Sequence, residues 1–205
     1  KKINAYKKLA KFLNYFFIFN NKSPNKMTYY LKSSMSFVIN MFTNDTKNQL
    51  NSNAISEICS KINPEKKVQI VQFGIGDGSL TKEILKRLSQ DSILYSFGAN
   101  RANCAYVKRN IDDKRLMVIY DEPSNFRRYV SDQVDNFINT FPFTFFKKQN
   151  KLNLLQSCFS QLKGNGVYSH IVFNDKEFVK QINGRIFEKK HVKSLYNEIV
   201  FHIKN

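Results

Sequence analysis

Three glycines at alternate positions, Gly74, Gly76 and Gly78, are the residues of this sequence best suited to bind a ligand. Glycine has no Cβ atom, so a turn made of glycines can bend tightly and bring its backbone close to a bound molecule. Residues 68–73, before the turn, are rich in β-branched and apolar side chains and predict a buried strand. We expect Ser79 to be the N-cap of the helix that follows. The pattern predicts the opening strand–turn–helix unit of a doubly wound sheet, with the ligand crevice at the carboxyl end of the strand.

The composition indicates an intracellular protein that binds polyanions. The chain has 205 residues, enough for one domain with a hydrophobic core. Its 33 basic and 16 acidic side chains give a net charge of +17, which favours RNA, DNA or an anionic membrane as partner. Cys59, Cys104 and Cys158 are widely separated, which predicts small buried thiols in a reducing compartment, with neither a disulfide partner nor metal-ligand spacing.

The amino-terminal quarter of the chain differs from the rest in its charge. Residues 1–50 contain nine lysines and one acid, Asp45, and apolar residues between Leu9 and Phe17 recur at helical spacing. Such a helix can lie on a membrane surface, remain from an organelle-targeting region, or pack against its own domain. We therefore expect a basic, aromatic helical arm over residues 1–50 and an α/β domain over residues 51–205.

The remaining periodicity predicts strands that alternate with helices, which is typical of an α/β fold with a mostly parallel sheet. We expect strands over 68–73, 92–97, 116–120, 134–139, 167–173, 185–187 and 195–203, and helices over 27–42, 51–62, 79–88, 100–110 and 152–162. The last two strands are expected to pair antiparallel. Gly164 and Gly166 are expected to stop the helix before them.

Three stretches of the sequence resemble class I S-adenosylmethionine-dependent methyltransferases. Ser52–Ile58 is similar to their ligand-flanking helix, Phe73–Thr81 to their Leu-Gly-Pro-Gly-x-Gly-x-Leu-Thr motif, and Thr140–Phe143 to their Gly-Leu-Pro-Phe or Asn-Leu-Pro-Tyr element. The similarity covers about residues 50–205 and is strongest to the phospholipid N-methyltransferases and the ribosomal RNA adenine dimethyltransferases. The length fits the phospholipid branch better, because the dimethyltransferases usually continue into a further helical domain. The resemblance implies a Rossmann-like fold with a seven-stranded, mostly parallel sheet.

The chain departs from that family at the positions that would hold the cofactor. Gln72 replaces an acidic residue two positions before the first glycine, and Gly98 replaces the acid that accepts the ribose hydroxyls. A carboxylate suits the ribose because it accepts two charge-assisted hydrogen bonds. Asn100 is the candidate to compensate for Gly98, and Asp121 lies where the family contacts the adenine amine. The resemblance implies that S-adenosylmethionine is held by these residues and the three glycines; the departures predict that its binding is weak or lost.

The candidate substrate end is Thr140, Pro142 and Phe143. In the resembling families a polar residue and an aromatic at this point hold a target nitrogen in line with the methyl donor. Methyl transfer needs mainly positioning and an aromatic-lined, desolvated pocket. If the protein is active, these three residues are its catalytic candidates; alternatively, the phenylalanines only cover the edge of the sheet.

The histidines offer neither a base nor a metal site in the sequence. His170 lies inside a predicted strand and is expected to be a core residue. His191 and His202 lie in a lysine-rich tail without a cysteine or carboxylate at metal-ligand spacing, so no metal is expected. Basic runs occur at Arg127–Arg128, Lys147–Lys148 and Lys189–Lys193, and they either bind phosphates or form solvated faces.

Two functions from different classes are compatible with these features. In the first, the protein is a catalytically degenerate methyltransferase-fold subunit that is structural or binds RNA, for example in an organellar (mitochondrial) ribosome. In the second, it is an active N-methyltransferase that acts on a phospholipid amine or an RNA adenine, with an anionic, cytoplasmic membrane surface as the alternative partner. The loss of two carboxylates and the basic, acid-poor amino terminus favour the first.

Overall fold

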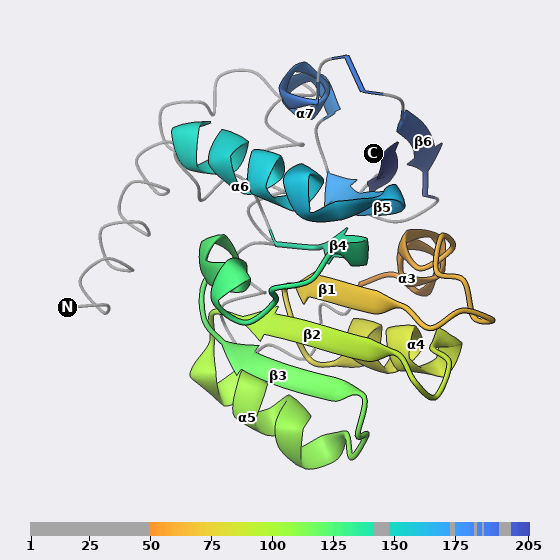
Figure 1. Ribbon diagram of the computed structural model, residues 1–205, viewed down its shortest axis with the longest axis vertical. Coiled ribbons are helices and arrows are strands. Elements are labelled where there is room, and N and C mark those ends of the chain that lie inside the picture. Colours follow the sequence, from red (N-terminus) through yellow and green to blue (C-terminus); the bar gives the residue numbers. More distant parts are fainter. Residues whose placement is uncertain (1–49, 142–147, 173–174, 183, 186, 193–197) are drawn as a thin grey trace, which may run out of the picture.

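The computed structural model describes residues 50–141, 148–172, 175–182, 184–185, 187–192 and 198–205 (Figure 1). The strands are β1 (Gln69–Phe73), β2 (Ile93–Gly98), β3 (Leu116–Tyr120), β4 (Val134–Asn139), β5 (Leu162–Val172), β6 (Phe187–His191) and β7 (Ile199–Lys204). The helices are α3 (Ser52–Ile58), α4 (Ser79–Arg87), α5 (Arg101–Asn110), the 3-10 helix η1 (Pro123–Arg128), α6 (Lys148–Gln161) and α7 (Asp175–Gln181). The helices predicted within residues 1–49 lie outside the described residues.

The strands form one seven-stranded sheet in the order β3-β2-β1-β4-β5-β7-β6. Strands β1 to β5 pair in parallel, and β7 pairs antiparallel with both β5 and β6. The predicted mostly parallel sheet, with residues 68–73 inside it and an antiparallel carboxyl-terminal pair, is confirmed. Because β1 lies between parallel β2 and β4, the carboxyl ends of these three strands meet at one edge of the sheet.

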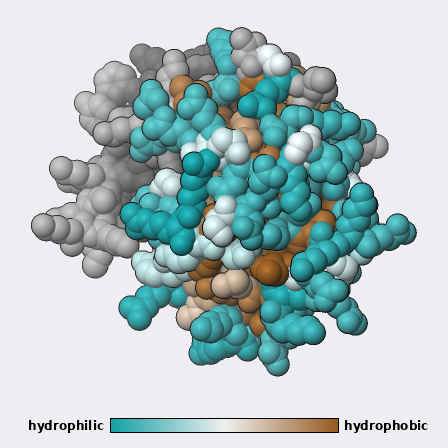
Figure 2. All heavy atoms as spheres, in the orientation of Figure 1, coloured by the Kyte–Doolittle hydropathy of each residue, from teal (hydrophilic) through white to brown (hydrophobic). Residues whose placement is uncertain are grey.

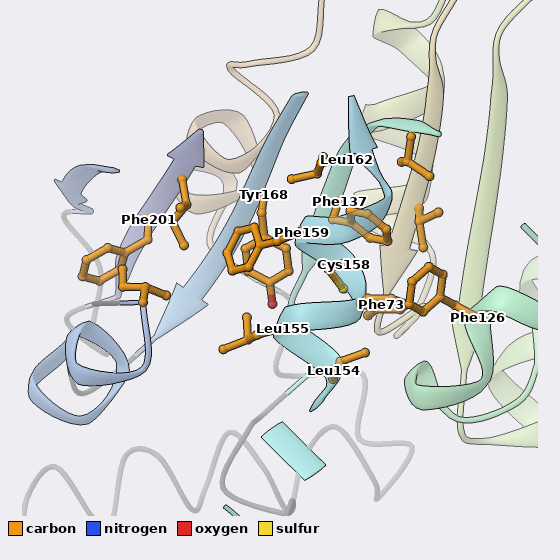
Figure 3. Close-up of a cluster of buried hydrophobic side chains, with 14 of the residues drawn as sticks. Phe73, Phe126, Phe137, Leu154, Leu155, Cys158, Phe159, Leu162, Tyr168 and Phe201 are labelled. Atoms are coloured by element: carbon orange, nitrogen blue, oxygen red, sulfur yellow. The ribbon is translucent and has the colours of Figure 1, made fainter. Parts of the chain in front are cut away.

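Helices cover both faces of the sheet, so its central strands are apolar on both sides. On one face η1 and α6 bury an aromatic cluster in which the rings of Phe73 and Phe126 meet edge-to-face, their centroids 5.7 Å apart (Figure 3). On the other face α3 and α4 bury Ile58 and Ile84 against β1, β2, β4, β5 and β7. Cys104 and Val107 of α5 pack beside them against the glycine turn and β3. The site therefore rests on strands fixed from both sides.

The fifth strand differs from its prediction. It begins at Leu162 instead of residue 167, and Gly164 and Gly166 lie within it. The pairing partners explain this: Val134 pairs with Leu162 but Asn136 pairs with Val167, so the glycines occupy a register shift between β4 and β5. The helix before them ends at Gln161, as their position predicts.

Candidate functional site

The glycine turn between β1 and α4 has the backbone conformation for which glycine is suited. Gly74, Gly76 and Gly78 have φ angles of 95°, 52° and 87°, all in the left-handed region. The N–H groups of Gly74 and Ile75 both donate to the carbonyl of Phe97 at 3.0 Å, which ties the turn to the end of β2. The turn is thus shaped by its own backbone contacts as well as by its glycines.

The start of α4 is capped differently from the prediction. Gly78 is the N-cap, and Ser79 is the first residue of the helix. The carboxylate of Asp77 accepts hydrogen bonds from the Ser79 N–H at 2.9 Å and the Ser79 hydroxyl at 2.8 Å. Asp77 therefore supplies the acceptor that was expected from Ser79, because Gly78 can adopt the left-handed conformation between them.

Gln72 replaces the family's acid with a buried amide whose hydrogen-bonding groups have partners. Its Oε1 accepts from the hydroxyls of Thr81 at 2.9 Å and Ser96 at 3.0 Å. Its Nε2 donates to the Gly74 carbonyl at 3.1 Å. The amide joins β1, β2, α4 and the turn, and a carboxylate in its place has no proton to donate to Gly74.

Gly98 lies where the resemblance implies a ribose-binding acid, and the space around it is filled. A Cβ atom on Gly98 would lie 2.5 Å from Ile75 Cγ2 and 2.6 Å from Cys104 Sγ, closer than van der Waals contact. Both neighbours are themselves buried. A side chain at residue 98 therefore fits only if Ile75 and Cys104 move.

The two polar residues expected next to the cofactor are bonded within the protein. Asn100 is the N-cap of α5, and its Oδ1 accepts from the Ala102 N–H at 2.8 Å. Asp121 accepts from Asn125 Nδ2 at 2.8 Å and from the Tyr129 hydroxyl at 2.9 Å. These bonds, the one from Asn125 above all, hold the pKa of Asp121 below its usual range. Asn100 and Asp121 thus stabilise the loops after β2 and β3.

Thr140, the polar candidate of the substrate end, turns its hydroxyl toward the glycine turn. Its Oγ1 lies 3.1 Å from the Phe73 carbonyl and 3.2 Å from the Gly74 carbonyl, and it donates its one proton to this pair. The Thr140 side chain is buried against Gly74, where a Cβ atom would lie 2.5 Å from it. Pro142 and Phe143 lie outside the described residues.

Comparison with known proteins shows structural similarity without sequence similarity. No family model and no curated protein sequence matches the chain. Solved structures that match include an rRNA methylase from Streptococcus thermophilus, with a TM-score of 0.58, 13% identity and coverage of 77% of this chain and 99% of that chain. A SAM-dependent methyltransferase from Aquifex aeolicus matches with a TM-score of 0.62, 12% identity and coverage of 80% and 96%. An O-methyltransferase from Bacillus cereus, in complex with SAH, matches with a TM-score of 0.60, 10% identity and coverage of 94% and 97%.

The chain has the class I methyltransferase fold. The fold expected from the glycine turn and Thr140–Phe143 is confirmed, whereas the particular likeness to phospholipid or ribosomal RNA enzymes stays a prediction. In this methyltransferase fold the glycine turn follows β1, Gly98 is the last residue of β2, and Thr140 follows β4. The structure therefore brings the glycine turn, Gly98 and Thr140 together at the carboxyl ends of neighbouring strands.

A buried polar cluster that was not predicted from the sequence lies behind the substrate end. Asn139 Nδ2 lies 2.8 Å from both the Tyr168 hydroxyl and His170 Nδ1, and Asn139 Oδ1 accepts from the Phe141 N–H at 2.8 Å. Burial lowers the pKa of His170 to about 3, so this imidazole is neutral. His170 is a core residue, as predicted. The cluster could have been predicted from polar residues near the carboxyl ends of two neighbouring strands, Asn139 in β4 and His170 in β5.

His202 has a carboxylate partner that the sequence does not show. Its Nε2 lies 3.2 Å from Glu57 Oε1 of α3, and its Nδ1 lies 2.8 Å from the Ser169 hydroxyl of β5. The partner was missed because 145 residues separate His202 from Glu57. Burial lowers the pKa of His202, and the hydrogen bond to Glu57 opposes this effect. Ser169 and His202 are both buried, so the arrangement fixes α3 to the sheet.

A cavity of about 350 Å³ opens between η1, α6 and the start of β4. Its lining includes Arg127, Gln133 and Ser160, and Arg127 Nη2 donates to the Ser157 carbonyl at 3.2 Å. Gln133 precedes β4, whereas Thr140 follows it, so the cavity lies at the end of the strand away from the glycine turn. This cavity is therefore separate from the glycine turn and Thr140.

The described residues contain no group of three or more His, Cys, Asp and Glu side chains that could hold a metal ion. Cys59, Cys104 and Cys158 are buried, as predicted, and burial raises the pKa of Cys59 to about 12. No helix in the part of the chain that the structure describes has the length and apolar character to span a bilayer.

Proposed function

We propose that this protein is a methyltransferase-fold subunit whose S-adenosylmethionine site is degenerate and which serves a ribonucleoprotein complex as an RNA-binding or structural component. The observation that supports a degenerate S-adenosylmethionine site is the close packing around Gly98. Glycine at this position does more than remove a carboxylate. Ile75 and Cys104 fill the space where an acidic side chain would begin. The ribose hydroxyls of the cofactor would meet no charged acceptor there.

The hydrogen bonds of the turn support the same proposal. The Gly74 carbonyl accepts from Gln72 at 3.1 Å and lies 3.2 Å from the Thr140 hydroxyl. Asn100 Oδ1 is used by the N-cap of α5. Polar groups that a cofactor would contact thus already have partners inside the protein, and a ligand gains little by replacing one hydrogen bond with another.

The charge of the chain supports RNA as the partner. The net charge is +17, and residues 1–67 account for +9 of it through 12 lysines and three acidic residues. Within the described domain, α5 carries Arg101, Lys108 and Arg109 and no acid. Such a surface binds phosphates without sequence preference, and each neutralised phosphate releases counterions. An organellar ribosome, with its mitochondrial location, is one assembly that fits this chemistry.

One observation favours an active enzyme as the second candidate. All three glycines of the turn keep left-handed φ angles, which is the conformation a cofactor-binding turn requires. In that case Thr140, with Pro142 and Phe143, would orient a target amine of an RNA adenine or a phospholipid.

Transfer of a labelled methyl group separates the two functions. The full chain is incubated with radiolabelled S-adenosylmethionine and, in parallel, with total RNA and with vesicles that contain phosphatidylethanolamine. We expect no more label in either acceptor than with Gly74→Trp, a variant that fills the turn against Thr140. Time-dependent labelling of one acceptor by the wild-type protein would establish the enzyme and overturn the proposal.

A further inference from the structure

The two outer strands of the sheet differ in how they are protected against pairing. β6, at one edge, has the sequence Phe-Glu-Lys-Lys-His, and charged side chains of this kind block the approach of another strand. β3, at the other edge, has the sequence Leu-Met-Val-Ile-Tyr, without a charge, proline or glycine. Met117 is 48% exposed and Tyr120 is 50% exposed. No strand among the described residues pairs with the outer side of β3.

Figure 2 shows hydrophobic atoms in the region over β2 and β3, between hydrophilic residues. Met117 of β3 has the half-buried Tyr95 of β2 as its neighbour in register. The 3-10 helix η1 is only six residues long, and Tyr129 after it is 44% exposed. An exposed apolar edge of this kind is a template for pairing with another strand.

The outward-facing N–H and C=O groups of β3 are placed so that they can pair antiparallel with the same groups of a second copy of the strand. The Arg115 carbonyl accepts from the Leu94 N–H at 2.8 Å, so Arg115 faces β2. Successive residues of a strand direct their backbone groups to opposite edges, and Leu116, Val118 and Tyr120 therefore direct theirs outward. A two-fold axis at Val118 makes Val118 face its own copy and Tyr120 face Leu116. The Leu116 N–H already donates to the Asp113 carbonyl at 3.0 Å, which leaves four new hydrogen bonds in this register.

The side chains match in the same register. Met117 comes opposite Ile119 of the second copy on one face of the sheet, and the exposed Tyr120 comes opposite Leu116 on the other. The charges that flank the strand are complementary as well. Lys114 before β3 comes opposite Glu122 after it, and both are exposed. A shift by two residues in either direction separates Lys114 from Glu122, so the charge pair is made only in the register centred on Val118.

We infer that β3 is an interface for a second copy of this chain, and that the two seven-stranded sheets join antiparallel about Val118 into one continuous sheet. The occupant is a second copy because both the apolar pairs and the Lys114–Glu122 pair are satisfied by the chain itself. Each copy carries a net charge of +17, and α5 beside β3 is basic, so the copies repel each other at low salt. Dimerisation therefore strengthens as salt is added, which is opposite to the salt dependence of RNA binding.

Sedimentation of the full, nuclease-treated chain tests this interface. We expect the mass to rise from 24.1 kDa toward twice that value with protein concentration, and to do so at lower concentration in high salt. Met117→Lys puts a charge on the open edge, and Val118→Pro removes the outward N–H that the pairing needs; each should leave a monomer. Phe187→Lys is the matched control, because Phe187 is a 39% exposed aromatic on the opposite edge strand, and it should not alter dimerisation.

A charge exchange tests the register and does not depend on the folding of the proline variant. Lys114→Glu places Glu opposite Glu122 twice in each dimer and should weaken dimerisation about tenfold. Adding Glu122→Lys should restore it, with the net charge of the wild type. A wild-type chain that stays monomeric up to about 1 mM overturns the inference. So does a dimer that persists in Met117→Lys, or one that the double exchange does not restore.

Discussion

At the scale of single residues, the hydrogen bonds of the candidate site converge on the turn after β1. The Gly74 carbonyl accepts from Gln72 Nε2 at 3.1 Å, and the Thr140 hydroxyl lies between this carbonyl and that of Phe73. Gln72 also accepts from Thr81 and Ser96. Each of these groups is buried or nearly so, and a buried polar group that loses its partner costs about 1–3 kcal/mol.

Gln72→Glu, which restores the family's acid, should destabilise the protein. The carboxylate would face the Gly74 carbonyl without a proton to donate, and we expect a loss of about 2–4 kcal/mol at pH 7. Burial should raise the carboxyl pKa in the folded state, so the loss should shrink as the pH falls and the group becomes protonated. Urea unfolding at pH 7 and pH 5 measures both effects.

Gln133→Glu, an exposed change of the same type, is the control and should alter the free energy of unfolding by less than about 0.5 kcal/mol. A Gln72→Glu protein as stable as the wild type would show that the amide network does not hold the turn.

Gly98→Ala should also destabilise the protein, because the added methyl group meets Ile75 at 2.5 Å and Cys104 at 2.6 Å. Overpacking of a buried contact costs about 1–3 kcal/mol. Thermal or urea unfolding should show this loss. Gly164→Ala is the matched control, since nothing lies within 4 Å of its Cβ position, and equal effects of the two changes would contradict the crowded contact.

The same crowding bears on the proposed loss of ribose binding, and we expect that Gly98→Glu alone does not create a ribose-binding carboxylate. The sequence shows the missing carboxylate, but it does not show that Ile75 and Cys104 have taken its space.

At the scale of elements, the positions of the strands can be predicted from the sequence, whereas most of the polar contacts between elements cannot. Residues 116–120 and 134–139 form the strands predicted for them, because short apolar runs between turn residues are visible in the sequence. The hydrogen bond from Ser96 to Gln72 and the contact of His202 with Glu57 join residues far apart in the chain, and no local pattern reports them. The start of β5 was misplaced because its pairing with β4 shifts register.

Two buried histidines hold neighbouring elements together and should make stability depend on pH. Burial lowers the pKa of His170 to about 3 and also lowers that of His202. The unfolded chain therefore binds more protons below pH 6.5, and stability is lost as the pH falls through that value. We expect the free energy of unfolding to fall by up to about 1.4 kcal/mol per pH unit between pH 6.5 and 5 because of His170, and His202 should lower it in the same direction.

Urea titrations at half-unit pH steps measure this slope. His170→Asn should reduce it by about the contribution of one histidine, whatever its effect on stability at pH 7. A wild-type free energy of unfolding that is constant between pH 6.5 and 5 would contradict a neutral, buried His170.

At the scale of the whole molecule, charge is distributed unevenly along the chain. Residues 1–67 contain 12 lysines and three acids, and the first 44 residues contain no acid. A domain that transfers methyl groups does not need such an extension, whereas a segment that docks on a polyanion does. This uneven charge is read directly from the sequence, and it is the reason that we propose a polyanion, with RNA first, as the partner.

Deletion of residues 1–42 should remove most of the affinity for RNA and leave the α/β domain folded. Binding of a labelled RNA by the full chain should weaken steeply between about 50 and 200 mM salt, because each neutralised phosphate contributes to the salt slope. Fluorescence anisotropy of both proteins, with anionic vesicles in parallel, measures this. Equal binding by the shortened chain would show that the amino-terminal segment is only a packing element, and preferential binding of vesicles would favour the membrane.

Calorimetric titration of the full wild-type chain with S-adenosylmethionine tests the central claim most directly. Loss of a bidentate, charge-assisted contact with the ribose costs about 2–3 kcal/mol, or roughly 30- to 150-fold in affinity. With Gly98 packed by Ile75 and Cys104, we predict a dissociation constant no lower than the high micromolar range, about 500 µM or weaker. A dissociation constant in the low micromolar range, about 10 µM or tighter, would contradict a degenerate site and favour the active methyltransferase.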